Sequence, residues 1–461
     1  MSRAACRRLP TPSAAPIRIG LAALALALAG CAATEPVEGL SSVRFGAVTL
    51  PRGVARSNLD LGQDFLDLTF ALENGEALPA ILRYETPVRV YMRSSALAPY
   101  APDLAALLNR IRVEAGIDIA ETDDPEAAQI RIEAVPAADI ARIFPTAACF
   151  IVPEERSWAE FMRDRAAPQV RWSEQRTLRR AAIFLPPDTT PQDLRDCLNE
   201  EVTQALGPAN DLYRLPDSIW NDDNFHGMAT RFDMLMLRTL YQPELRSGMT
   251  RAEVAARLPK VLDRVNPQGR GAPRAARAPE SKAFATALEI ALDRDASHER
   301  RLGAAKLAAQ IAAEMRPVDH RLGVALLTLG RLSLRQDPAA AAQDFAEAYR
   351  LFQRQLGPDD VRTAQAGVHL AALALGTGQY RTAIVLADRH VPVAAKAQNA
   401  ILIAGLLSVK AEAQAALGDD TAARETRLDS LRWARYGFGD TDGALAREQA
   451  QLAALQRLEQ K

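Results

Sequence analysis

Residues 197–211 read CLNEEVTQALGPAND and lie on a predicted helix and just beyond it. Pro191 suits the first turn of that helix, where no backbone N–H is needed for a hydrogen bond. Gly207 allows the chain to turn sharply, and Pro208 follows it. The stretch thus places several polar side chains at fixed helical spacing before and after one turn: Glu200, Glu201, Gln204, Asn210 and Asp211.

This spacing resembles the H-E-x-x-H-x-x-G-x-x-H motif of the metzincin zinc peptidases. In that family two histidines at i and i+4 bind zinc from one helix face, the Glu acts as general base, the Gly turns the chain, and a third His completes the site. Here the three histidine positions hold Glu200, Gln204 and Asn210, whereas Glu201 and Gly207 match the base and the turn. The resemblance implies a zincin-like fold whose zinc ligands have been replaced.

The resemblance continues downstream of the motif. Residues 218–220 read SIW and resemble the Met-turn, with Trp220 in place of Met, and residues 233–241 resemble the closing helix of the matrixin branch. As a whole, residues 57–250 resemble an uncharacterised family of secreted bacterial lipoproteins that is classed as a domain of unknown function. The pattern of that family, C-L-x-E-E-x-x-Q-x-L-G-x-x-N-D, is matched from Cys197 to Asp211.

The substituted residues determine which chemistry is available. Two amides and a carboxylate offer only oxygen ligands, which suit calcium or magnesium better than zinc. The domain contains a single histidine, His226, and one imidazole does not make a zinc site. We therefore expect no metal and no cofactor. Glu201 would be catalytic only if the domain were active, since it would have no metal-bound water to activate.

Structural roles are the simpler explanation for the same residues. Glu200 and Glu201 are most simply a solvated pair near a helix start, where the helix dipole favours acids. Gln204 and Asn210 are placed to hydrogen-bond one another across the turn and to hold the helix end. Residues 221–224 (NDDN) lack the spacing of an EF-hand and predict an exposed turn.

The N-terminus has the features of a bacterial export signal. Four arginines and no acid precede the apolar run 19–29, which is too short to span a membrane. Leu28-Ala29-Gly30-Cys31 resembles a lipobox, which implies a signal peptide over 1–30, a lipid on Cys31 and a tether over 31–56. Ala32 and Ala33 favour the periplasmic face of the outer membrane of a Gram-negative bacterium. The alternative is an ordinary signal peptide in which Cys31 is incidental.

Composition excludes several classes of protein. The 461 residues are 48% hydrophobic and 25% charged, which excludes collagen-like, coiled-coil and wholly disordered chains. Without the four arginines of residues 1–30, 52 basic residues face 57 acidic ones, a net charge of about −5. This mildly acidic balance argues against nucleic acid as a partner.

Two cysteines remain after Cys6 leaves with the signal and Cys31 takes the lipid. An oxidising periplasm favours a disulfide between Cys149 and Cys197. The alternative is a pair of buried free thiols.

Hydrophobic periodicity predicts a mixed α+β domain over residues 57–265. The predicted elements are helices over 59–72 and 102–115, strands over 88–92, 130–134 and 181–185, and a helix that Thr189 or Thr190 caps. Residues 266–280 follow, with Arg270, Arg274 and Arg277 among prolines and glycines. They predict a flexible linker.

Residues 281–461 are Ala- and Leu-rich and predict helices throughout. Ala341, Ala383 and Ala423 recur at intervals of 42 and 40 residues, and Ala304 is placed to open the series. The pattern resembles long tetratricopeptide repeats, which would expose a groove for a peptide or protein partner. A non-repeat helical bundle is the alternative.

These observations predict a lipid-anchored periplasmic binding or scaffold protein, built from a pseudo-zincin domain and a helical repeat array. One alternative is a divergent cell-envelope hydrolase, peptidase-like, that uses Glu200 and Glu201. Another is a purely structural lipoprotein. Glu201→Gln separates the first two, because only a hydrolase would lose activity.

Overall fold

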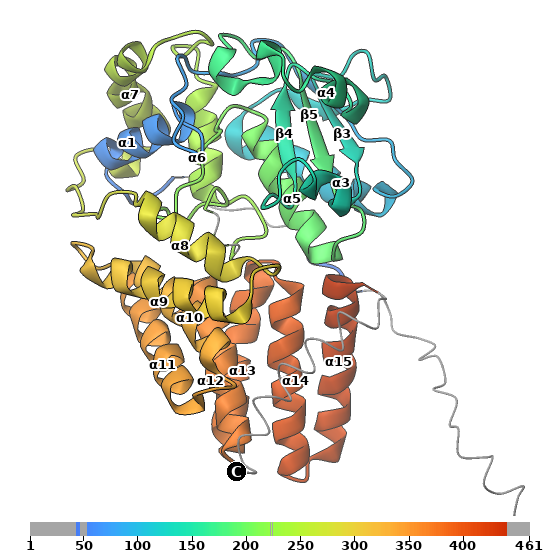
Figure 1. Cartoon of the computed structure of the whole chain (residues 1–461), viewed down its shortest axis with the longest axis vertical. Coiled ribbons are helices and arrows are strands. Elements are labelled where there is room, and N and C mark those ends of the chain that lie inside the picture. Colours follow the sequence, from blue (N-terminus) through green and yellow to red (C-terminus); the bar gives the residue numbers. More distant parts are fainter. Residues whose placement is uncertain (1–42, 47–52, 222, 224, 440–461) are drawn as a thin grey trace, which may run out of the picture. The chain divides into compact units, whose positions relative to one another are not determined.

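One five-stranded sheet organises the α/β region (Figure 1). Its strand order is β2-β1-β3-β5-β4 in the computed structural model, which describes residues 43–46, 53–221, 223 and 225–439. All neighbouring pairs are parallel except β4 with β5, so β4 is an antiparallel edge strand. The strands are β1 (Val88–Tyr91), β2 (Ile119–Glu121), β3 (Ile130–Ala134), β4 (Phe150–Pro153) and β5 (Ala181–Leu185).

The sequence predicted β1, β3 and β5 but missed the two edge strands. Strand β2 has only three residues, and β4 has four and ends at Pro153. Residues 119–121 are too few to alternate, and residues 150–153 (FIVP) carry no polar side chain, so neither stretch shows an alternating pattern. Each becomes a strand by pairing with its neighbour, β1 or β5. The signal peptide, Cys31 and most of the tether (31–56) lie outside the described residues.

Three helices of the α/β region begin at capping residues that the sequence carries. Thr190 caps α5 by accepting a hydrogen bond from the backbone N–H of Asp193, and Thr230 and Thr250 each form a capping box. The longer helices are α1 (Asn58–Thr69), α2 (Ala101–Arg110), α5 (Pro191–Gln204), α6 (Arg231–Leu240) and α7 (Arg251–Val265). Two short helices, α3 (Ala137–Ala141) and α4 (Trp158–Asp164), were not predicted.

A disulfide joins Cys149 to Cys197, with an S–S distance of 2.03 Å. It links the residue before β4 to the middle of α5, across 48 residues of chain. The predicted pairing is confirmed, and the free-thiol alternative is wrong.

The C-terminal region is helical over its described residues. Its helices are α8 (Lys282–Leu292), α9 (His298–Glu314), α10 (His320–Ser333), α11 (Pro338–Gln355), α12 (Val361–Gly376), α13 (Tyr380–Lys396), α14 (Ala400–Ala416) and α15 (Asp420–Phe438). Each packs on the next, and α12 also packs on α14. None of the described helices combines the length and the apolar character that a membrane crossing requires.

Small residues allow these helices to approach closely. Ala341, Ala383 and Ala423 are buried in α11, α13 and α15, the second helix of each pair. In α9 the first buried alanine is Ala305 rather than Ala304, one residue later than the sequence suggested. At Gly330, a Cβ atom would lie 2.7 Å from the Phe345 ring, so a larger residue would push α10 and α11 apart.

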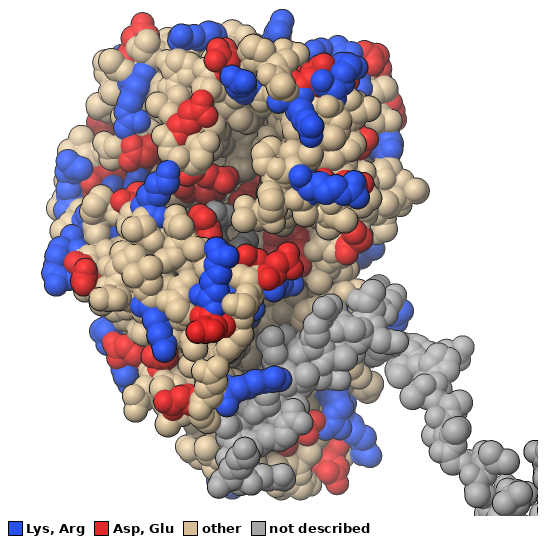
Figure 2. Space-filling model, viewed as in Figure 1, with Lys and Arg blue, Asp and Glu red and all other residues tan. Residues whose placement is uncertain are grey.

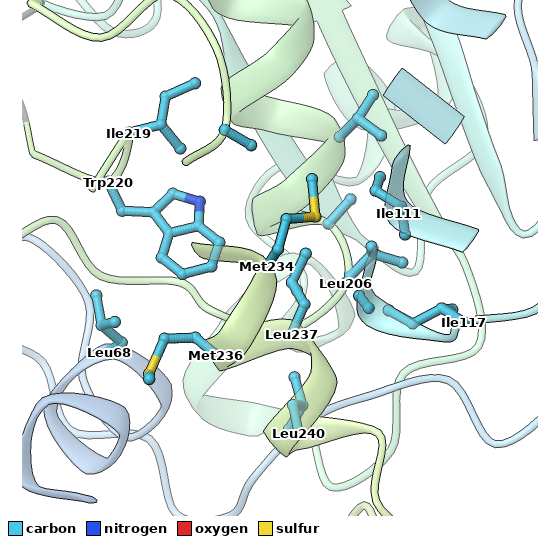
Figure 3. Packing of buried hydrophobic residues seen from close by; sticks show 14 of the residues in the cluster. Leu68, Ile111, Ile117, Leu206, Ile219, Trp220, Met234, Met236, Leu237 and Leu240 are labelled. Atoms are coloured by element: carbon cyan, nitrogen blue, oxygen red, sulfur yellow. The ribbon is translucent and has the colours of Figure 1, made fainter. Parts of the chain in front are cut away.

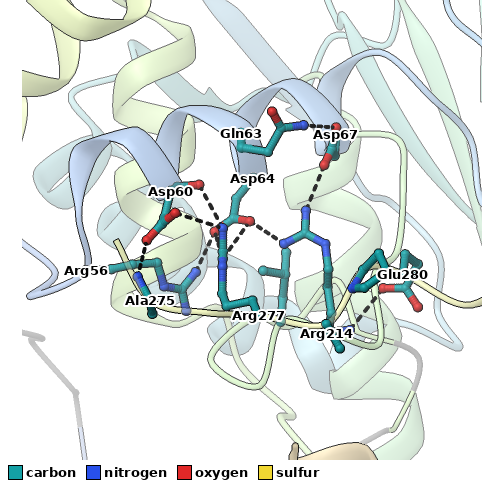
Figure 4. Close-up of polar contacts among 12 residues, drawn as sticks. Arg56, Asp60, Gln63, Asp64, Asp67, Arg214, Ala275, Arg277 and Glu280 are labelled. Atoms are coloured by element: carbon teal, nitrogen blue, oxygen red, sulfur yellow. Dashed lines mark hydrogen bonds and ion pairs between the residues drawn. The ribbon is translucent and has the colours of Figure 1, made fainter. Parts of the chain in front are cut away.

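Residues 270–280, here called the strap, are not a flexible linker. Arg277 Nη1 donates to both carboxylate oxygens of Asp64 at 2.9 and 2.8 Å (Figure 4). Arg274 Nε donates to Asp60 at 3.0 Å. Arg274 and Arg277 are therefore paired with acids of α1, and Arg270, the third arginine of the predicted linker, faces Asp263 of α7. More than 200 residues separate the partners, so no local pattern indicated the contact.

Candidate functional site

Helix α5 places Glu200, Glu201 and Gln204 in its last five residues. Glu201 is only 5% exposed, and Glu200 is half-buried. The expectation of a solvated acidic pair near a helix start is therefore wrong. The cap at Thr190 puts the positive end of the helix dipole ten residues upstream, so the dipole does not stabilise these acids.

The two amides of the motif, Gln204 and Asn210, are engaged by other groups. Gln204 Nε2 donates to both carboxylate oxygens of Asp211, at 3.1 and 2.9 Å. Asn210 Nδ2 donates to the backbone carbonyl of Asp67 at 2.8 Å, at the C-terminal end of α1. The predicted bond between Gln204 and Asn210 is wrong, because the turn carries Asn210 towards α1 rather than back over the helix.

Gly207 forms the turn and cannot be replaced without strain. Its φ is +137°, a region open to glycine. A Cβ atom there would lie 2.3 Å from the carbonyl oxygen of Leu82 and 2.6 Å from Leu240 Cδ2. The turn is thus pressed between two other segments of the domain, and this packing fixes where Asn210 and Asp211 lie.

Trp220 is fully buried beside the motif helix (Figure 3). Its indole Nε1 donates to Thr203 Oγ1 of α5 at 3.1 Å. Its backbone carbonyl accepts a hydrogen bond from Leu212 at 3.1 Å. Apolar side chains surround the ring, including Leu68 and Met236. The indole therefore fills space next to the motif with hydrocarbon, and it ties the segment after the motif to α5.

Hydrogen bonds between Ser218, Asp233 and the backbone of Ile219 hold the chain next to this tryptophan. Ser218 Oγ donates to Asp233 at 2.6 Å, and Ile219 N donates to the same carboxylate at 3.0 Å. Burial raises the pKa of Asp233 to about 6 despite these hydrogen bonds. Asp233 is also the acid of the capping box that begins α6. One buried carboxylate therefore binds both residues 218–219 and the start of α6.

The other ligand candidates point away from the motif. His226 Nε2 hydrogen-bonds the carbonyl of Pro216 at 2.8 Å, and burial and the nearby Arg362 lower its pKa. Asn221 and Asp223 are both buried, and Asp223 is ion-paired with Arg362 at 2.6 Å, so the exposed turn predicted over 221–224 is wrong at these two residues. Residues 222 and 224 lie outside the described residues. In the described part of the chain, no three His, Cys, Asp or Glu side chains are grouped to hold a metal ion.

Charges of both signs are interspersed over the visible face of the protein (Figure 2). Among the described residues on this face, neither sign forms an extended field that would steer a highly charged polymer.

Sequence reasoning missed two contributors to the site. Thr203 lies inside the motif, but its role as acceptor for Trp220 depends on a residue 17 positions away. Asp67 contributes only its backbone carbonyl, which carries no signal in the sequence.

Residues 58–260 match the family described as "Protein of unknown function (DUF2927)". The matched stretch contains the whole sheet, the disulfide and the motif, and it ends within α7. It confirms the domain of unknown function that the sequence pattern indicated. No curated protein matches the chain.

Proposed function

We propose that this protein is a lipid-anchored scaffold of the periplasm, in which a zincin-like domain without zinc is joined to a tetratricopeptide-like array. One observation carries the proposal. The amides of Gln204 and Asn210, at two former ligand positions, are held by Asp211 and by the carbonyl of Asp67. A zinc site requires three ligands that converge on one point, and here two of them are committed elsewhere.

The surroundings of the motif support a zincin-like origin. A helix ends in a glycine turn, and the segment that returns beneath it buries Trp220 against that helix. Since the tryptophan and its apolar neighbours fill this space, the domain is suited to presenting a surface rather than to activating water.

The array supplies the partner-binding part of the proposal. Pairs of helices that pack on their neighbours, with small residues at the crossings, are the architecture from which repeat proteins build a groove. A protein or peptide would bind there, and the lipobox at Cys31 would hold the complex at the outer membrane.

Zinc content tests the pseudo-enzyme part. The chain from residue 32 to 461 is purified from an oxidising compartment, incubated with zinc, dialysed and analysed for bound metal. We expect far less than one equivalent, because oxygen donors bind zinc weakly. Stoichiometric zinc that survives dialysis would overturn the proposal.

Glu201→Gln separates scaffold from hydrolase in cells. Partners cross-linked to the array should be the same for the variant and the wild type. If peptide or cell-wall hydrolysis by the wild-type protein is detected and the variant abolishes it, the hydrolase alternative replaces the scaffold.

A further inference from the structure

The helical array hydrogen-bonds the segment that follows the motif, residues 212–221, at two backbone carbonyls. His320, the first residue of α10, donates from Nε2 to the carbonyl of Tyr213 at 2.8 Å. Arg362, the second residue of α12, donates from Nη1 to the carbonyl of Pro216 at 2.6 Å. Both side chains come from the N-terminal ends of neighbouring helix pairs, so one edge of the array holds this segment.

Arg362 is fully buried, and every side of its guanidinium is occupied. Nη2 and Nε donate to Asp223 Oδ2 at 2.6 and 3.0 Å. The Phe225 ring lies 5.1 Å from Cζ, and His226 shares the carbonyl of Pro216. A planar five-donor group is needed for this pattern, and its removal would leave a buried carboxylate without its partner.

Hydrogen bonds within segment 212–221, and one from Trp220 to α5, connect the segment to the motif site, by which we mean residues 200–211 and Trp220. Leu212 N donates to the carbonyl of Trp220 at 3.1 Å, and Asn221 Nδ2 donates to the carbonyl of Leu215 at 2.7 Å. Trp220 in turn is bonded to Thr203 of the motif helix. Segment 212–221 therefore connects Arg362 of α12, bound at Pro216, with Thr203 of α5, bound at Trp220.

A second set of contacts connects the strap to the N-terminal end of α10 and to segment 212–221. Arg321, next to His320, is almost fully buried and donates to the carbonyls of Pro279 and Ala278 at 2.9 and 3.3 Å. Arg214 N donates to Glu280 at 3.0 Å. The array thus fixes segment 212–221 directly and also through the strap.

We propose that the helical array sets the conformation of segment 212–221, with Arg362 and His320 as the positioning residues. The motif site keeps its arrangement only while the N-terminal ends of α10 and α12 hold these two carbonyls. A partner that displaces either helix end would therefore alter the motif site, and by linkage a ligand of the motif site would alter binding to the array. Only this coupling between partner binding and the motif site rests on the proposed function. The positioning of segment 212–221 requires no partner.

Hydrogen exchange of the mature chain with Arg362→Met tests the proposal. Amides of residues 205–221 should exchange at least about tenfold faster than in the wild type, whereas amides of β5 should be unchanged, because opening is local. Arg350→Met in α11 is the matched control, since it removes an exposed arginine from the same array. Unchanged exchange over 205–221 would overturn the proposal, as would an equal acceleration in all segments.

A pair of His320 variants provides a second test that does not depend on the buried charge. Gln can donate to the carbonyl of Tyr213 and should preserve the slow exchange of residues 212–215, whereas Leu cannot donate and should lose it. Equal exchange in His320→Gln and His320→Leu would show that the hydrogen bond does not position the segment. Neither result depends on zinc content or on partner binding, so this inference and the proposed function fail independently.

Discussion

At the scale of single residues, Gly207 shows how a position outside every regular element determines the site. Its positive φ and its contact with the Leu82 carbonyl leave no room for a side chain. The sequence marked this residue as a turn, and the structure adds that the turn is clamped by packing. If this packing around Gly207 were lost, Asn210 would move away from α1 and Asp211 would move away from Gln204.

Gly207→Ala should lower the free energy of unfolding by about 3 kcal/mol, since both backbone strain and a steric clash are introduced. Urea denaturation followed by circular dichroism measures the change. Gly303→Ala is the control, because a Cβ atom added to Gly303 in α9 would meet no neighbouring atom within 4 Å. That control should raise stability by about 0.5–1 kcal/mol, as alanine does in helices. Equal effects of the two substitutions would contradict the packing argument.

At the scale of elements, α11 and α12 meet through the stacked rings of Phe345 and His369, whose centroids are 4.6 Å apart and whose planes differ by 7°. His369 Nε2 is buried without a hydrogen-bond partner among the described residues. Burial, followed by the charge of Arg331, lowers the pKa of His369 to about 3. A histidine therefore serves here as an aromatic packing residue that must stay neutral.

This histidine should make the array sensitive to acid. In the unfolded chain its pKa is about 6.5, so between that value and about 3 the unfolded state binds more protons than the folded state. Its contribution is complete above pH 6.5 and falls by about 1.4 kcal/mol per unit as the pH decreases towards 3.

His369→Phe keeps the stacked pair and removes the titrating group. The variant should therefore lose less stability than the wild type between pH 6 and pH 4, measured by urea denaturation at each pH. His298→Phe is the control, because it removes a histidine from an exposed position in α9. Parallel pH profiles for wild type and His369→Phe would disprove the assignment.

At the scale of the whole molecule, ion pairs join segments that are distant in sequence. Asp64 of α1 is fully buried and pairs with Arg56, Arg214 and Arg277, so one carboxylate links the N-terminal segment, the segment after the motif and the strap (Figure 4). Burial alone would raise the pKa of Asp64, but the three arginines hold it below its ordinary value. The described residues all belong to one compact unit, in keeping with such links.

Asp64→Asn should destabilise the protein by about 3–5 kcal/mol, because three arginines lose their shared buried carboxylate. The strap should then be cut faster by trypsin at Arg274 and Arg277, measured by mass spectrometry of the early fragments. Asp388→Asn, which removes an exposed acid paired with Lys410, should leave cleavage of the strap at the wild-type rate. A strap that stays equally resistant in Asp64→Asn would show that Asp64 does not hold it.

The extent of sequence-based prediction differs between the fold and the site. Strands β1, β3 and β5, the capped start of α5 and the helical character of residues 282–438 were predictable, because propensity, capping residues and periodicity are local. The partners of Gln204 and Asn210 were not. A side-chain amide can donate to any nearby oxygen, and the turn at Gly207 decides which one is near.

The sequence by itself determined the two-part architecture, the motif spacing on α5 and the cysteine pair that forms the disulfide. Each of these depends on residue type and on short spacing, or on there being only two cysteines beyond residue 31. Only the tertiary structure decided that the linker is a strap, that Trp220 is packed against the motif helix and that Arg362 holds the segment after the motif. These are contacts between residues far apart in the chain, so their energies arise from burial and geometry that no local pattern encodes.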